Sequence, residues 1–180
     1  MKANQFFKSP IGNLMVTASQ QGVTGIGYVD DTNYDNSGLS LKSDVCDAID
    51  AGHTDFNSSK HIQLACMELQ QYFDGHLKQF TFPIDLSGTN FQMHVWQQLQ
   101  QIEFGKTISY RKLALLLGDV KCIRAAASAN GKNPLAIAIP CHRVIGSNGN
   151  LIGYAGGLWR KKWLLQHEGV LPNFELNFNG

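Results

Sequence analysis

The sequence predicts a two-part α/β fold: a small antiparallel sheet with a helix in residues 1–88, then a mainly helical domain in residues 89–180. Three short runs rich in β-forming residues open the chain and are separated by turn signals. Apolar residues at helical spacing follow over 62–73 and again after residue 89. A chain of 180 residues can bury one large or two small cores, so both parts can be independent domains.

Three strands are predicted at the N-terminus, over residues 5–8, 13–19 and 23–28. Ser9-Pro10-Ile11-Gly12 and Gln20-Gln21-Gly22 supply the turns between them. Because both connections are short, we expect an antiparallel meander.

The remainder of the first part alternates between irregular and helical patterns. Residues 30–59 are rich in Asp, Asn, Ser and Gly, so we expect a long surface excursion with at most a marginal helix. The apolar spacing over 62–73 predicts a helix that covers the sheet. Residues 80–88 are expected to form an extended linker between the two parts.

The helical part opens with a capping box, in which Thr89 is the N-cap and Gln92 reaches back to it. We expect this helix to end at Phe104-Gly105-Lys106. One face of it carries the apolar residues Phe91, Val95, Leu99 and Ile102.

Two shorter helices follow. Ser109 is a predicted N-cap for residues 110–117, Gly118 ends that helix, and residues 121–130 form the next one, closed by Gly131. Two helices joined by a short Gly turn resemble a helix-turn-helix, whose second helix enters a DNA groove.

The second of these helices has almost no large side chains after Arg124. Its small residues are Ala125, Ala126, Ala127, Ser128 and Ala129. Such a helix can be buried in the core, or it can press against a shallow, narrow groove with Arg124 as the projecting cation. The latter describes minor-groove docking with a wedge into the base stack.

The candidate reactive residue is Cys141. The apolar run over 135–139 suits a buried strand that stops at Pro140, and Cys141 follows it together with His142 and Arg143. A Gly- and Asn-rich loop comes next, where the backbone can approach a ligand closely. Ionisable neighbours can hold a thiolate, although a Cys after an apolar run can also be a buried small hydrophobe.

The last predicted helix spans residues 159–167. Its predicted apolar residues are Trp159, Trp163 and Leu164. Glu168 follows this helix and is either solvated or the group that orients His142 in a nucleophile–base–orienter set. Residues 171–180 are expected to be a tail.

Charge is divided unevenly between the two parts. Residues 1–88 contain five Lys and Arg against ten Asp and Glu, whereas residues 89–180 contain ten against four. The excess predicts a nucleic-acid face on the second part, the alternative being an ordinary solvated surface.

Cysteine usage and hydropathy indicate the cellular compartment in which the protein works. Four scattered Cys without a CxxC pair or a secretory signal predict reduced thiols and a cytoplasmic protein. No apolar run approaches membrane-spanning length. Because no Cys or His pairs have metal-ligand spacing, no metal site is expected.

Several motifs together resemble the O6-alkylguanine-DNA alkyltransferase family. They are Asn133-Pro134, Pro140-Cys141-His142-Arg143-Val144, Tyr154-Ala155-Gly156-Gly157, Ile108-Ser109-Tyr110, Arg124-Ala125-Ala126 and His167-Glu168-Gly169. The resemblance is dense over residues 89–169 and looser in the N-terminal part. Position 155 is Ala where some members have Ser, and position 136 is Ala where some have a second Pro.

The resemblance implies DNA repair by direct reversal: a flipped O6-alkylguanine, and also O4-alkylthymine, would pass its alkyl group irreversibly to Cys141. His142 would take the thiol proton through a water, and Glu168 would hold His142 in the right tautomer. Asn133 would brace the turn that shapes the pocket. Tyr110 would assist flipping and give a proton to the leaving guanine. The product is a thioether without a carbonyl for water to attack, so each molecule would act once.

The resemblance also implies the binding residues and partners. Arg124 would fill the space that the flipped base leaves, and residues 154–157 would cover the base and offer a backbone donor to O6. The implied DNA-contacting residues are Tyr110, Arg124, Ala125, Ala126, Ala127, Ser128 and Ala129. The implied substrate-pocket residues are Val144, Tyr154, Ala155, Gly156 and Gly157. The partner would be double-stranded DNA containing O6-alkylguanine, and the protein would act as a monomer without cofactor or metal.

Two other functions compete with this interpretation. A non-catalytic damage-binding module would bind alkylated DNA and tolerate Cys141→Ala. A cysteine hydrolase using Cys141, His142 and Glu168 would turn over repeatedly and would not need Arg124 or Tyr110.

Overall fold

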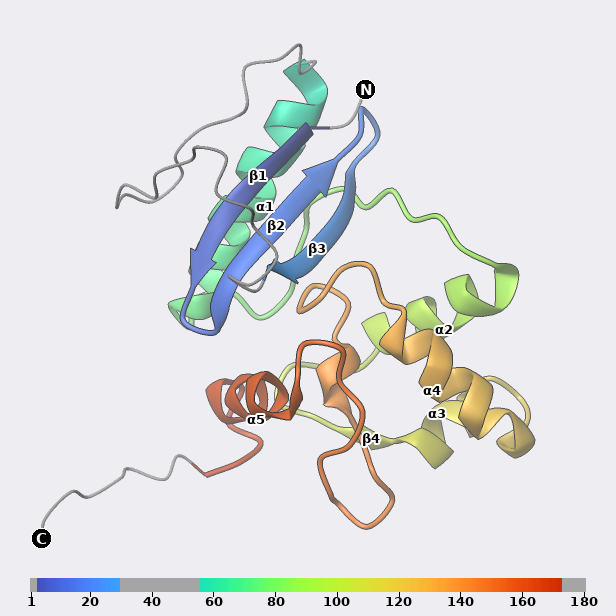
Figure 1. The fold of residues 1–180 in the computed structure, drawn as a ribbon. Coiled ribbons are helices and arrows are strands. Elements are labelled where there is room, and N and C mark those ends of the chain that lie inside the picture. The colour runs from blue at the N-terminus through green and yellow to red at the C-terminus, as the bar shows by residue number, and fades with distance from the viewer. Residues whose placement is uncertain (1–2, 30–55, 173–180) are drawn as a thin grey trace, which may run out of the picture.

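Three strands form an antiparallel sheet in the order β1-β2-β3, as predicted (Figure 1). They are β1 (Ala3–Ser9), β2 (Gly12–Ala18) and β3 (Val23–Val29). The computed structural model describes residues 3–29 and 56–172, so most of the predicted excursion over 30–59 lies outside the described residues.

One long helix covers a face of this sheet. Helix α1 (Phe56–Phe73) confirms the predicted helix and begins earlier than its apolar spacing indicated. It packs on β1 and β2, and its buried Ile62 and Leu69 share one core with Phe7 of β1 (Figure 1). Residues 56–59 therefore belong to a helix and not to the excursion.

The linker over residues 80–88 is extended, as predicted, and is pinned to the first part. Ile84 forms an isolated parallel bridge with Val23, and the buried Glu68 carboxylate of α1 accepts a hydrogen bond from the Thr81 amide at 2.7 Å. Because its backbone is held on both sides, the linker fixes where the helical part begins.

Helix α2 (Asn90–Gln100) starts with the predicted capping box. The Gln92 amide donates to Thr89 Oγ1 at 3.2 Å, and Gln92 Oε1 accepts from the Thr89 amide at 2.9 Å. The helix ends at Gln100, before the predicted Phe104-Gly105-Lys106. Its core face also differs, because Phe91 is exposed while Trp96 is buried and donates from Nε1 to the Ala129 carbonyl at 3.0 Å.

The predicted pair of helices follows as α3 (Tyr110–Leu116) and α4 (Ile123–Gly131), which pack on each other. Ser109 caps α3 by accepting from the Lys112 amide at 3.0 Å. A short 3-10 helix, η2 (Val120–Cys122), occupies the start of the range predicted for the second helix. Gly131 is the last residue of α4, so it does not close the helix from beyond its end as predicted.

The strand predicted over 135–139 is wrong. Ile137 has a positive φ of 72°, and the Ile139 amide donates back to the Leu135 carbonyl at 3.0 Å, so the segment is a turn. Leu135, Ile137 and Ile139 are all buried, which explains why the pattern resembled a strand. After this turn comes a 3-10 helix, η3 (Cys141–Arg143).

A two-stranded parallel sheet links η3 to the start of α3. It consists of β4 (Ile108–Ser109) and β5 (Val144–Ile145). The chain then forms a loop and the last helix, α5 (Leu158–His167), which lies below the turn between β1 and β2 (Figure 1).

The predicted apolar face of α5 is partly wrong. Trp159 is 56% exposed, whereas Arg160 and Lys161 are buried beside Leu164 and Leu165. Helical spacing places 160, 161, 164 and 165 on one face. The buried face therefore carries two cations, which need hydrogen-bond acceptors inside the protein. Within residues 3–29 and 56–172, no helix combines the length and apolar character needed to cross a membrane.

Candidate active site

The Cys141 thiol begins η3 and borders a cavity of about 350 Å³. Its side chain is nearly buried, with 6% of the residue exposed. Asn133 Nδ2 lies 3.1 Å from Cys141 Sγ and donates to it. The cavity falls in the size range of small-molecule sites, so the thiol faces a space that can hold one planar base.

Asn133 also braces the turn that delivers the thiol. Its Nδ2 donates to the Ile139 carbonyl at 2.8 Å and to the Leu135 carbonyl at 3.2 Å, and its Oδ1 accepts from the Leu135 amide at 3.0 Å. One side chain therefore holds the strained turn and contacts the sulfur.

The environment of Cys141 favours the neutral thiol. Burial raises the pKa of the Cys141 thiol, and the donor from Asn133 and the positive charge of Lys161 lower it only in part. The sequence suggested that ionisable neighbours hold a thiolate; the structure instead places a protonated thiol at rest. A nucleophilic sulfur must then be generated during the reaction by removal of its proton.

His142 is fully buried and faces the carboxylate of Glu168. The distance from His142 Nε2 to Glu168 Oε1 is 2.7 Å. Burial lowers the pKa of the His142 imidazole, although Glu168 opposes this effect. A neutral ring that donates from Nε2 leaves Nδ1 as a proton acceptor, and Nδ1 has no hydrogen-bond partner among the described residues.

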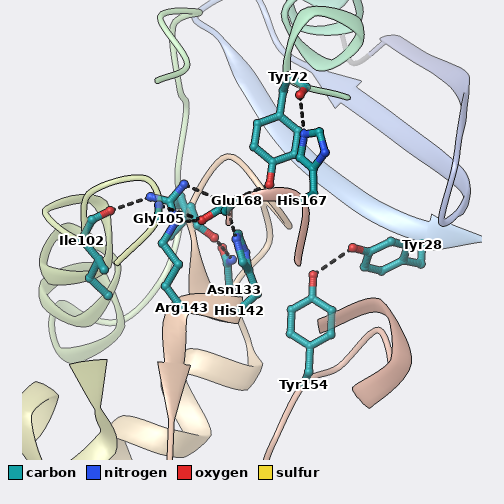
Figure 2. Close-up of polar contacts among 11 residues, drawn as sticks. Tyr28, Tyr72, Ile102, Gly105, Asn133, His142, Arg143, Tyr154, His167 and Glu168 are labelled. Atoms are coloured by element: carbon teal, nitrogen blue, oxygen red, sulfur yellow. Dashed lines mark hydrogen bonds and ion pairs between the residues drawn. The ribbon is translucent and has the colours of Figure 1, made fainter. Parts of the chain in front are cut away.

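Glu168 gathers donors from three segments of the chain (Figure 2). Tyr72 on α1 donates its hydroxyl to Oε1 at 2.8 Å, and the Gly105 amide lies 3.4 Å from Oε2. Arg143 donates from Nε to Oε2 at 2.8 Å and from Nη2 to Oε1 at 3.0 Å. Burial opposes ionisation, but the bonds from His142 and Arg143 prevail and lower the pKa of Glu168 to about 2. The carboxylate is therefore ionised at neutral pH.

Tyr110 lies at the start of α3 and contacts the loop after β5. Its hydroxyl donates to the Gly153 carbonyl at 3.2 Å and accepts from Asn130 Nδ2 at 3.4 Å. Burial raises the pKa of the Tyr110 phenol, and the nearby Cys141 adds to this effect. The phenol thus stays protonated and can act as a donor.

Lys161 is a cation that the sequence analysis gave no role. Its Nζ donates to the carbonyls of Val144 at 2.6 Å, Ile152 at 2.5 Å and Gly153 at 3.2 Å. Burial lowers the pKa of Lys161 to about 8, and the neighbouring Cys141 opposes this. The ammonium ties β5 to the loop that precedes the pocket segment.

The predicted pocket segment is only partly at the cavity. Tyr154, Ala155 and Gly156 line it, together with Cys141 and Asn133. Val144 and Gly157 do not: Val144 is buried in β5, and Gly157 is the N-cap of α5 with a φ of 88°. Both predictions of direct pocket contact are therefore corrected.

The predicted DNA-contacting face of α4 is narrower than expected. Ala126 and Ala129 are buried against the core, because helical spacing turns them inward. Arg124, Ala125 and Ser128 are exposed, and Ala127 is half-buried. One side of this helix is therefore buried in the core, and the other side is exposed.

The basic excess is also smaller at the surface than the composition indicated. Of the ten Lys and Arg in residues 89–180, Arg143, Arg160 and Lys161 are buried and bonded within the protein. The others lie on the exposed surface: Lys106, Arg111, Lys112, Lys121, Arg124, Lys132 and Lys162.

Two tyrosines of the N-terminal part reach the site, and sequence reasoning missed both. Tyr72 bonds Glu168, and Tyr28 of β3 lines the cavity. Tyr72 lies on the predicted buried face of its helix, where a polar hydroxyl needs a partner; that requirement was the available signal. No local pattern marks Tyr28, whose side chain contacts Tyr154 and Arg160, more than a hundred positions away.

No metal is suggested by the arrangement. Among residues 3–29 and 56–172, no three His, Cys, Asp or Glu side chains are grouped so that they could hold a metal ion. Cys122 and Cys141 are free thiols.

Two domain families match consecutive parts of the chain. Residues 3–86 match the ribonuclease-like domain of 6-O-methylguanine DNA methyltransferase, and residues 90–170 match its DNA binding domain.

Individual proteins are similar along nearly the whole chain. A methylated-DNA–protein-cysteine methyltransferase of Methanosarcina acetivorans is 37% identical over 163 residues, which cover 91% of this chain and 96% of that protein. A crystal structure of the Mycobacterium tuberculosis O6-methylguanine methyltransferase is 34% identical, with a TM-score of 0.74 and 96% of each chain covered. A structure of the Mycobacterium tuberculosis protein in complex with DNA is 36% identical, with a TM-score of 0.73 and 92% of each chain covered.

The Glu168 network predicts a pH-dependent contribution to stability. Because the pKa of Glu168 is about 2 in the folded protein against 4.5 ordinarily, its contribution is full above about pH 5 and is lost as the pH falls toward 2. Glu168→Gln should lower the free energy of unfolding by about 3 kcal/mol at pH 7, since it leaves the Arg143 cation buried without its counterion. The deficit relative to wild type should shrink between pH 5 and pH 3.

Urea denaturation of wild type and Glu168→Gln at pH 7 and at pH 3 measures the deficit in the free energy of unfolding at each pH. Glu103→Gln, which changes an exposed carboxylate, is the matched control and should alter stability by less than about 0.5 kcal/mol. An equal deficit for Glu168→Gln at pH 7 and pH 3 would contradict the ionised, hydrogen-bonded carboxylate.

Proposed function

The chain belongs to the 6-O-methylguanine DNA methyltransferase family, and we propose that it repairs DNA by moving the alkyl group of O6-alkylguanine onto Cys141. One observation carries the proposal: a nearly buried thiol borders a base-sized cavity, with a buried imidazole–carboxylate pair adjacent in sequence to it and an amide donor on its sulfur. O4-alkylthymine is proposed as a second substrate.

The transfer forms a bond between Cys141 Sγ and the alkyl carbon and breaks the bond from that carbon to O6. The thiol proton passes through a water to His142 Nδ1, the ring atom left as acceptor when Nε2 donates to Glu168. Asn133 donates to the sulfur as negative charge develops on it, which favours the thiolate.

The leaving guanine needs a proton or a hydrogen bond on its ring. Tyr110 is protonated and adjoins Asn130, a residue that lines the cavity, so it is suited to that role. Tyr154 and Gly156 line the cavity from the loop over 154–156, whose backbone would approach the base. Because Ala155 has no hydroxyl, recognition of O6 by this loop depends on main-chain donors.

The substrate reaches the cavity as a flipped nucleotide. The exposed Arg124, Ala125 and Ser128 of α4 present a low surface with one projecting cation, which fits a narrow minor groove. Extrusion of a base costs a few kcal/mol, and less for a weakly paired damaged base. We place double-stranded DNA as the partner of a monomer that needs no cofactor.

The product is a thioether, which has no carbonyl for water to attack, so hydrolysis does not regenerate the thiol. Each molecule therefore acts once, and we assign the reaction to methylated-DNA–protein-cysteine methyltransferases acting in a single turnover. Residues 1–88 and 89–180 are proposed as the two domains, and the free thiols of the described residues support a reducing, cytoplasmic location.

Incubation with a duplex carrying one O6-methylguanine should add the mass of a single methyl substituent to the protein. The increase should saturate at one per molecule and map to the peptide containing Cys141. Intact-protein mass spectrometry followed by peptide mapping measures both. Cys141→Ser should abolish the increase, whereas Cys122→Ser, at another free thiol, should retain it. Tight binding without any mass change would favour a damage-binding module, and repeated turnover would favour a hydrolase.

Arg124→Ala should slow transfer from duplex DNA by about tenfold or more. The variant lacks the side chain that fills the gap in the base stack and so offsets the cost of unstacking the target base. Transfer from the free base O6-methylguanine should change by less than about twofold, since no stack is opened. Lys60→Ala, which removes an exposed cation from α1, is the control and should affect neither rate. Equal losses on both substrates would rule out the wedge role of Arg124.

A further inference from the structure

Strand β3 of the N-terminal sheet joins the two walls of the cavity. The Ile26 amide donates to the Pro134 carbonyl at 2.9 Å, and the Ala136 amide donates to the Ile26 carbonyl at 2.9 Å. The turn held by Asn133 is therefore bonded to the edge of this strand. This turn forms one wall, since Pro134 and Ala136 line the cavity.

The opposite wall is attached to the same strand through Tyr28. Residues 26 and 28 point to the same side of a strand, and both line the cavity. The hydroxyls of Tyr28 and Tyr154 are hydrogen-bonded at 2.8 Å, and their rings meet edge to face with centroids 6.1 Å apart (Figure 2). Tyr28 therefore spans the distance between the sheet and the loop that covers the base.

The ring of Tyr28 is held in place from two further directions. The guanidinium carbon of Arg160 lies 4.5 Å from the ring centroid, and Arg160 Nε donates to the Ile11 carbonyl at 2.8 Å. Gly156 packs directly against the ring: a Cβ built on it would lie 2.4 Å from Tyr28 Cε2. The ring is thus a fixed surface and not a side chain that swings out of the cavity.

From this arrangement we propose that Tyr28 is a specificity determinant, whose ring closes the space beside Cys141 and limits the transferred group to small alkyl groups. The inference rests on the proposed transfer to Cys141. It adds that the N-terminal sheet, and not only the helical part, selects the substrate.

The geometry of the transfer leads to this role. The first carbon of the alkyl group must approach Cys141 Sγ, so every further atom of a longer group must occupy the rest of the cavity. That space lies between the turn over 134–136 and the loop over 154–156, and β3 joins both. A methyl group needs none of it, whereas a benzyl group needs room for a whole ring at the position that Tyr28 borders.

The test compares the rates of transfer from two duplexes, one with O6-methylguanine and one with O6-benzylguanine. Tyr28→Ala should raise the ratio of the benzyl rate to the methyl rate by about tenfold, the scale at which pocket size discriminates between substrates. Tyr28→Phe keeps the ring and should leave the ratio within about twofold of wild type. Tyr28→Trp fills more of the space and should lower the ratio.

Phe6→Ala removes an aromatic ring from β1 of the same sheet, away from the lining of the cavity, and should leave both rates unchanged. Thermal melting of every variant establishes that it is folded. If Tyr28→Ala is unfolded, Tyr28→Leu replaces it, since Leu also removes the ring but fills more of the core than Ala. An unchanged ratio in the folded truncation, or an equal shift in Phe6→Ala, would overturn the proposal. If wild type transfers no methyl group at all, the proposed function fails instead.

Discussion

The buried carboxylate of Glu168 is the interaction on which the rest of the site depends. It accepts from Tyr72 on α1, from His142 and Arg143 in η3, and approaches the Gly105 amide before β4. A buried charge is tolerated only when such donors surround it. Because Glu168 is ionised, it fixes the hydrogen of His142 on Nε2, and the turn that carries His142 also carries Cys141. Packing of three distant segments thereby sets the protonation state of the base beside the nucleophile.

The two parts of the chain complete each other at this site. The N-terminal part supplies the Tyr72 hydroxyl to Glu168 and the Tyr28 ring to the cavity, while the backbone of β3 bonds to the turn over 134–136 of the helical part. Without β3, the turn that leads to Cys141 would lose its backbone hydrogen bonds to Ile26. The active site is therefore built from both parts of the chain.

The sequence predicted most elements because local signals mark them: the strand and turn pattern at the start, the capping box at Thr89 and the Ser109 cap all occur as expected. It failed where tertiary contacts override the local pattern. The alternating burial of residues 135–139 comes from a turn held by Asn133, and the buried face of α5 contains Lys161 because three carbonyls surround its ammonium. The motif around Cys141 could be recognised, but the roles of Tyr28 and Tyr72 could not, since their partners lie far away in sequence.

In the resting site, a neutral His142 donates from Nε2 to an ionised Glu168 and can accept the proton of a neutral Cys141 thiol. Nitrogen-15 NMR of the His142 ring, assigned with a His142→Asn variant, measures this protonation state. Because burial lowers the pKa of this ring, we expect the neutral tautomer protonated at Nε2 from pH 8 down to pH 6.5, the ordinary pKa of histidine. An imidazolium at pH 7, or a ring protonated only at Nδ1, would show that His142 is not the neutral acceptor.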